Sequence, residues 1–127
     1  SIMEEATRIQ VYECLGMNSD DELILYCAGG NAKRLRRYLE QRGVDIDGYC
    51  DGSKKLIGTY IDGKRCVARN AVNKNAVIIV TKDEPENLVK ELKQEGFKNV
   101  ISFKVIGPRI YSVVPIKEKA IESWSKM

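Results

Sequence analysis

A glycine pair between an apolar run and a basic run is the stretch of the sequence best suited to hold a ligand. Residues 27–32 read CAGGNA. Glycines let a ligand approach the backbone closely, and a helix that begins there supplies free N–H groups and a partial positive charge, which together suit a phosphate. The dinucleotide-binding pattern G-x-G-x-x-G/A is met at its second position by Gly29 and at its third by Ala32, while Cys27 replaces the first glycine.

Charged residues around this turn agree with a bound anion. Lys33 and Arg34 fall in the first turn of the expected helix, where the helix dipole disfavours cations unless an anion compensates. Asp51 ends the next apolar run, about 20 residues after the glycines, where an acid commonly accepts a hydrogen bond from a ribose hydroxyl. Lys54 and Lys55 would suit a 2′-phosphate. An ordinary strand-to-helix turn, a turn-forming acid and a solvated basic face explain the same residues, and both interpretations stay open.

Residues for catalysis or metal binding are hard to find in this sequence. It contains no histidine, which excludes Ser–His–Asp and Cys–His catalysis and His-ligated zinc. Tyr60 and Lys64 match the Tyr-x-x-x-Lys spacing of short-chain dehydrogenases, but Asp62 and Gly63 between them predict a turn rather than the helix that chemistry needs. We predict no catalytic residue and no metal ligand.

The cysteines have two readings. None of them forms a C-x-x-C pair, and their separations are long: Cys14, Cys27, Cys50 and Cys66. Three of them fall at the carboxyl ends of expected strands, where they would either gather as a thiolate site or pack as small buried hydrophobes. We favour the second reading.

Composition bounds the class of protein. The chain has 127 residues, 43% of them hydrophobic and 31% charged, which fits one domain with one core. A net charge of +3 without interleaved aromatic and basic residues does not favour a nucleic-acid partner. No apolar run reaches the roughly 18 residues of a membrane span, and no signal peptide is visible. We therefore expect a cytoplasmic protein without disulfides.

Apolar runs alternate with helical patterns along the chain. This alternation predicts an α/β fold, a Rossmann-like three-layer sandwich whose parallel sheet has about five strands in the order 3-2-1-4-5. The run AVIIV suits a strand covered on both faces. The expected strands, in chain order, are residues 22–27, 45–50, 64–67, 76–80 and 99–103.

Helices are expected at both ends and between the strands. An amphipathic pattern over residues 3–18 predicts an N-terminal helix, which covers the sheet or makes a dimer or inter-domain contact. Asp83 is expected to cap a later helix, with Pro85 in its first turn. Pro115 opens a last amphipathic helix. We expect a single domain, with an N-terminal helix in residues 1–20, a core in 22–103 and a C-terminal extension in 104–127.

A resemblance to a known family covers residues 22–103. The segments that carry it are LILYCAGGNAKRL, DIDGYCD, GTYIDGKRCV, AVIIVTK and LVKELKQEGFKNV. They resemble the Rossmann-type nucleotide-binding domain of bacterial polysaccharide-biosynthesis proteins. That domain opens sugar-nucleotide acetyltransferases and epimerase/dehydratases, and it is appended to some sugar methyltransferases and glycosyltransferases.

The resemblance implies a ligand, NAD(P) or a UDP-sugar, held at the glycine turn. The implied ligand-binding residues are Ala28, Gly29, Gly30, Asn31, Ala32, Lys33, Asp51 and Thr81. Of these, Asp51 would meet a ribose or another hydroxyl-bearing group, and Thr81 would line the same crevice. The family's catalytic left-handed β-helix and its long dehydratase C-terminal half have no counterpart here, so we expect an auxiliary domain of a longer surface-polysaccharide enzyme.

Two other functions stay open. The chain is either a structural or interaction module that has lost its ligand, or a small NAD(P)-dependent oxidoreductase, for which we can name no proton donor. Whether it forms a homodimer, or which nucleotide or sugar it takes, does not follow from the sequence.

Overall fold

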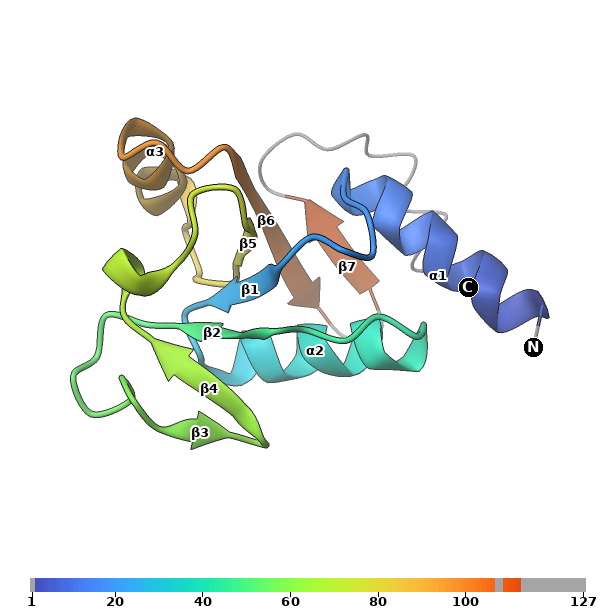
Figure 1. The fold of residues 1–127 in the computed structure, drawn as a ribbon, viewed down its shortest axis with the longest axis horizontal. Helices are drawn as coiled ribbons and strands as arrows, with labels where there is room; N and C mark the ends of the chain where they lie inside the picture. Colours follow the sequence, from blue (N-terminus) through green and yellow to red (C-terminus); the bar gives the residue numbers. More distant parts are fainter. Residues whose placement is uncertain (1, 107–108, 113–127) are drawn as a thin grey trace.

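The computed structural model describes residues 2–106 and 109–112, with side chains from residue 7 to residue 102 (Figure 1). A seven-stranded sheet in the order β3-β4-β2-β1-β5-β6-β7 forms its centre. The strands are β1 (Leu23–Tyr26), β2 (Gly48–Cys50), β3 (Tyr60–Ile61), β4 (Lys64–Val67), β5 (Val77–Val80), β6 (Asn99–Ile106) and β7 (Arg109–Ser112). The helices are α1 (Ile2–Leu15), α2 (Gly30–Gln41), the 3-10 turn η1 (Arg69–Ala71) and α3 (Glu86–Gln94).

The predicted α/β class and mostly parallel sheet are confirmed, and the architecture is broadly compatible with a Rossmann-like fold. Strands β4, β2, β1, β5 and β6 are parallel neighbours. The complete order differs from 3-2-1-4-5 because an antiparallel strand extends the sheet at each end: β3 pairs with β4, and β7 pairs with β6. The sheet therefore has more strands than the sequence predicted.

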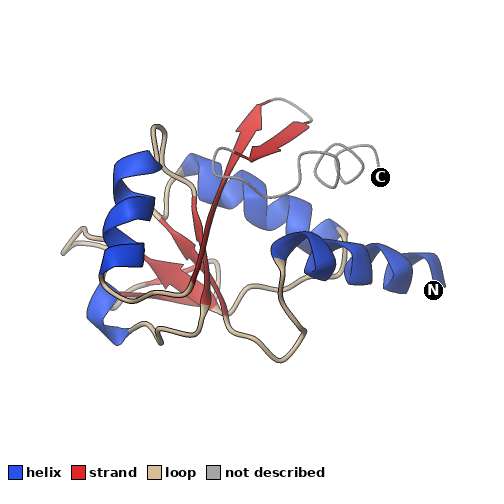
Figure 2. Cartoon of the chain, turned by 90° about the horizontal axis from the view of Figure 1, so that it is seen from above, coloured by secondary structure: helices blue, strands red, loops and turns tan. Residues whose placement is uncertain are grey.

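Helices lie on both sides of the sheet (Figure 2). Leu23 and Leu25 of β1 belong to a buried cluster with residues of α1 and α2, whereas Ile24 and Tyr26 belong to a second cluster with residues of α3. All four β1 side chains are buried, since successive side chains on a strand point to opposite faces. This explains why the strand is apolar without alternation.

The helix ends agree with the sequence in part. Gly16 has a left-handed φ of 67° directly after α1, and Gly43 has one of 75° after α2, as expected of C-terminal glycines. The predicted cap at Asp83 is wrong: Pro85 precedes α3 and makes no side-chain cap hydrogen bond. Asp83 instead accepts a hydrogen bond from Asn31, 3.3 Å away, because the two segments meet across the sheet edge. The helix predicted from Pro115 lies outside the described residues.

The glycine turn leaves the sheet at the point where its connections change direction. From β1 the chain crosses through α2 to β2 on one side, and the other parallel neighbour of β1 is β5. Such a switch point leaves a crevice beyond the carboxyl ends of the strands, and ligands of open α/β sheets bind there. The fold thus brings residues 27–32, 51 and 81 to one edge.

Candidate functional site

Cys27 gives the glycine turn its shape. Its φ is 74°, in the left-handed region that side chains rarely adopt. Its N–H donates to the carbonyl oxygen of Cys50 at 2.9 Å, and its own carbonyl oxygen accepts from the N–H of Gly29 at 2.9 Å. Cys27 therefore adopts the backbone conformation that a glycine would supply at the first position of the pattern.

The first turn of α2 has unused hydrogen-bond donors. Gly29 precedes the helix in an extended conformation, with φ −101°, and makes no side-chain cap hydrogen bond. The N–H of Lys33 donates to the carbonyl oxygen of Gly29 at 3.2 Å. Within the part of the chain that the structure describes, the N–H groups of Gly30, Asn31 and Ala32 have no acceptor. Gly29 and Gly30 are exposed, Asn31 is half-buried and Ala32 is buried. A Cβ built on Gly29 would meet nothing within 4 Å.

Arg34 lies over this helix start. A Cβ built on Gly30 would stand 3.5 Å from Nη1 of Arg34, and the guanidinium also donates to the side-chain oxygen of Asn31. Lys33 is exposed beside it. Positive side chains here add to the positive end of the helix dipole instead of opposing it, an arrangement that a bound anion stabilises.

Asn31 joins α2 to the segment after β5. Its amide nitrogen donates to the carbonyl oxygen of Thr81 at 3.1 Å and to Oδ1 of Asp83 at 3.3 Å. The side chain is half-buried. Asn31 therefore fixes the distance between the two sides of the crevice.

Asp51 holds the glycine turn against the loop that follows β2. Its Oδ2 accepts from the N–H of Ala28 at 2.8 Å, and its Oδ1 accepts from the N–H of Ser53 at 2.8 Å. Each carboxylate oxygen has a second lone pair, so the role predicted for Asp51, accepting from a hydroxyl, is compatible with both contacts.

Thr81 supports the turn from inside the protein. Its side chain is buried, and its hydroxyl lies 2.8 Å from the carbonyl oxygens of both Tyr26 and Cys27. Its N–H also donates to the carbonyl oxygen of Tyr26, at 3.0 Å. The structure thus places Thr81 beneath the turn, in contact with its backbone, and Ala32 is likewise fully buried, while residues 28–31 and Lys33 lie outside them.

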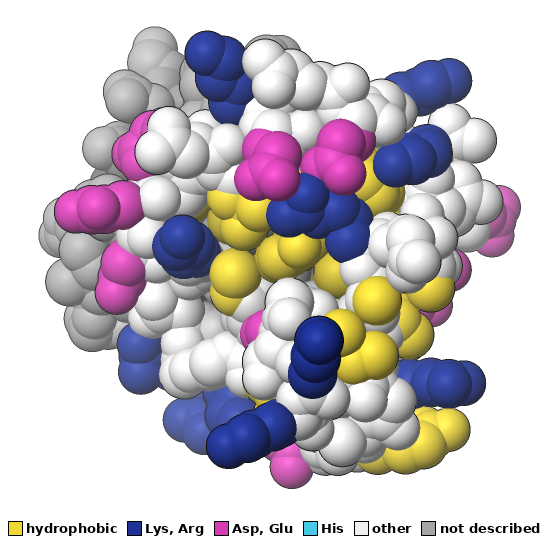
Figure 3. All heavy atoms as spheres, turned by 90° about the vertical axis from the view of Figure 1, so that its left-hand side faces the viewer, with side chains coloured by type: hydrophobic (Ala, Val, Ile, Leu, Met, Phe, Trp, Pro, Cys, Tyr) yellow, Lys and Arg dark blue, Asp and Glu magenta, His cyan; other side chains and the backbone are white. Residues whose placement is uncertain are grey.

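A groove of about 450 Å³ opens beside Asp51, at the carboxyl ends of β1 and β2, and Asp51 connects it to the glycine turn through its bond to Ala28. Its lining includes Tyr26, Asp51, Ile57, Arg69 and Glu95. Figure 3 shows the side of the molecule on which these strands end, with hydrophobic side chains at its centre and charged side chains around them. This volume lies within the range of about 300–1,000 Å³ that is typical of small-molecule sites.

Arg69 is the most highly connected side chain of this groove. Its Nε donates to the hydroxyl of Tyr26 at 3.0 Å, and its Nη1 lies 2.9 Å from Glu91 and 2.6 Å from Glu95. Burial opposes its charge, but the hydrogen bonds to Glu91 and Tyr26 raise the pKa of Arg69 above its usual value. For Tyr26 the effects are reversed: burial raises the pKa of its hydroxyl, and the hydrogen bond from Arg69 lowers it by less.

Sequence reasoning missed this Arg69 cluster. Its members come from β1, from η1 and from the end of α3 with the residue after it, which lie far apart in the sequence. The single available signal was the spacing of four residues between Glu91 and Glu95, which places both on one side of a helix.

The cysteines form no shared site. Cys66 belongs to the buried cluster on the α2 side, whereas Cys50 belongs to the cluster on the α3 side. Burial raises the pKa of the Cys50 thiol to about 12 and that of Cys27 to about 11, the latter with help from Asp51 and against Lys82. All four cysteines are free, and among the described residues no three His, Cys, Asp or Glu side chains could hold a metal ion.

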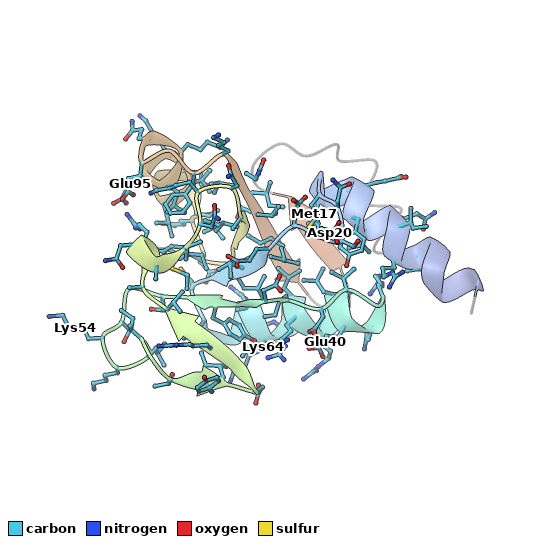
Figure 4. All side chains as sticks on the ribbon, in the orientation of Figure 1. Met17, Asp20, Glu40, Lys54, Lys64 and Glu95 are labelled. Carbon is cyan, nitrogen blue, oxygen red and sulfur yellow. The ribbon has the colours of Figure 1, made fainter. Side chains whose placement is uncertain are left out.

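Two other sequence signals can be placed. Tyr60 on β3 and Lys64 on β4 are joined by a turn with left-handed φ values of 47° at Asp62 and 81° at Gly63, so they do not share a helical face. Lys54 projects from its loop away from the body of the molecule (Figure 4).

Comparisons with known proteins give no family. The chain matches no family model, and a search of curated proteins finds no match. Among the described residues, no helix combines the length and the apolar character needed to cross a membrane.

Proposed function

We propose that this protein binds a nucleotide, NAD(P) or a UDP-sugar, with its phosphates at the start of α2. The observation that supports this most directly is the set of N–H groups at Gly30, Asn31 and Ala32 that have no acceptor among the described residues, beneath the guanidinium of Arg34. Backbone donors at a helix start, together with a cation, are the groups that hold phosphates in proteins. The groove beside Asp51 then provides room for the nucleoside.

The wider role follows from the resemblance of residues 22–103. We infer a Rossmann-like three-layer sandwich that serves as an auxiliary domain of a cytoplasmic, bacterial surface-polysaccharide enzyme. The core supports this inference: helices cover both faces of a mostly parallel sheet, and the glycine turn lies at the switch point.

Binding to NAD, NADP, UDP and UDP-sugars, measured by calorimetry, tests the proposal. At least one should bind, and Arg34→Gln should weaken that binding about tenfold because a charge-assisted hydrogen bond to phosphate is lost. Lys90→Gln is the matched control, since Lys90 is the fifth residue of α3 as Arg34 is of α2, and both are exposed. If none of the four ligands binds, the proposal is wrong.

A second candidate, an interaction module, is favoured by α1. The N-terminal part of this helix extends away from the sheet (Figure 2), and Ile9 on it is 50% exposed. Large apolar side chains at such places are found in contacts between chains. Ile9→Glu should then lower the mass measured in solution by light scattering, whereas an unchanged monomer mass would exclude a self-association role for this face.

A further inference from the structure

The groove next to the glycine turn has one unusual wall. Arg69 offers a guanidinium to the groove, but two carboxylates, Glu91 and Glu95, already bind its Nη1. One positive group against two negative ones leaves this wall with a net negative charge. The side chain of Arg69 is 25% exposed, so the wall is in contact with whatever occupies the groove.

The other charges of the groove do not reverse this balance. Asp51 adds a carboxylate at the opposite side, where it holds the N–H groups of Ala28 and Ser53. Lys74 contributes one ammonium group, which stands 3.8 Å from the centre of the Phe97 ring. Lys54 and Lys55, the two cations that the sequence offered for a 2′-phosphate, do not line the groove, and Lys54 points away from the body of the molecule (Figure 4).

We propose that Glu91 and Glu95 make this groove select a nucleotide with a free ribose 2′-hydroxyl, by neutralising the charge that Arg69 would otherwise offer to a 2′-phosphate. The inference rests on the proposed function. A hydroxyl can donate to a carboxylate such as Asp51, whereas a phosphate dianion meets two carboxylates that repel it and an arginine whose charge they already balance. The acids of α3 are thus specificity-determining residues, although α3 does not carry the phosphate site.

The test compares the dissociation constants of NAD and NADP, which differ only by the 2′-phosphate. The wild-type protein should bind NAD at least about tenfold more tightly, as expected where like charges are placed together. In Glu91→Gln/Glu95→Gln, Arg69 is released, and the preference for NAD should fall about fivefold or more. Glu95→Gln alone should shift it in the same direction by less, which keeps the test usable if the double variant unfolds.

The matched control is Asp20→Asn/Glu22→Gln. It removes the same charge just before the amino end of β1, at the opposite edge of the sheet, where both acids are exposed. It should change both affinities alike and leave their ratio within about twofold, because distant exposed charges are screened. A ratio that moves equally in the control would assign the effect to net charge and overturn the inference.

Other outcomes separate the inference from the proposed function. If the wild-type protein binds NAD and NADP equally, or if the double variant keeps the full preference, the role of Glu91 and Glu95 is wrong and nucleotide binding stands. If UDP-sugars bind and neither pyridine nucleotide does, the inference also fails alone. If no nucleotide binds, both fail.

Discussion

Two strand-to-helix turns lie side by side at the carboxyl edge of the sheet, and the charged side chains around them have opposite signs. The turn after β1 leads into α2, and the turn after β5 leads into α3. Each contains a residue other than glycine in the left-handed region, Cys27 with φ 74° and Glu84 with φ 53°. Their backbones thus use a similar device, so the difference between them lies in the side chains.

The start of α3 is neutralised by its own sequence. Glu86 lies in its first turn, and Asp83 and Glu84 precede it. Pro85 has no N–H that would need an acceptor. Acids at this place stabilise a helix through its dipole, so α3 needs no external anion.

The start of α2 has no such acids. Its first turn contains none, and Lys33 and Arg34 stand there instead. Local rules that a sequence breaks without an internal compensation are most often found at functional sites. The comparison teaches that the stability of α2 alone does not explain its first turn, whereas the phosphate we propose would compensate for these charges.

The largest expected effect should come from Thr81, which lies beneath the turn after β1. Thr81→Val should lower the free energy of unfolding by about 1–3 kcal/mol, because a buried hydroxyl that bonds to the carbonyl oxygens of Tyr26 and Cys27 is lost. Ser102→Ala is the matched control: Ser102 is buried and bonds to the carbonyl oxygen of Val80 on β5, whereas Thr81 bonds to that of Cys27 in the turn itself. Urea unfolding should show both losses, and only Thr81→Val should also weaken nucleotide binding.

A smaller effect should follow from exchanging the charges of the two turns. Lys33→Glu should stabilise the ligand-free protein by about 0.5 kcal/mol, and Glu86→Lys should destabilise it by about as much, because each changes the sign of a charge at a helix start. Thermal unfolding at low salt measures both. The functional explanation of α2 predicts that Lys33→Glu also weakens ligand binding, and unchanged affinity would contradict it.

The smallest effect should come from the left-handed residues. Cys27→Gly should raise the free energy of unfolding by less than about 0.5 kcal/mol, since relief of the left-handed strain only slightly exceeds the entropy that glycine adds to the unfolded chain. Glu84→Gly should do the same in the second turn. Cys27→Ala keeps the unfavourable φ and serves as the control. A loss of stability in Cys27→Gly would show that the thiol's packing outweighs the strain.

The central part of this fold could be predicted from the sequence because its signals are local. A buried apolar run such as residues 76–80 predicts a central strand by itself, and a glycine such as Gly43 is typical of the end of a helix. Strand β3 was not predicted, because a short edge strand such as Tyr60–Ile61 has too few residues to show a pattern. Pairing with β4 across a tight turn, not the strand's own sequence, defines it.

Only the part of the site that lies within one continuous segment could be predicted. Residues 27–32 stand together in the chain, and their turn was expected. The contact of Asp83 with Asn31 joins residues 52 positions apart, and the bond from Arg69 to Tyr26 joins residues 43 apart. Such pairs arise from the order of the strands, so no pattern within a window of the sequence contains them.

The carboxylate of Asp51 connects two segments that a bound ligand would contact. One side chain links the amide of Ala28, in the glycine turn, with that of Ser53, in the loop after β2. In the proposed complex, a ligand hydroxyl that bonds to either oxygen of Asp51 would weaken its hold on both amides. A ligand at one of these segments would then also loosen the other.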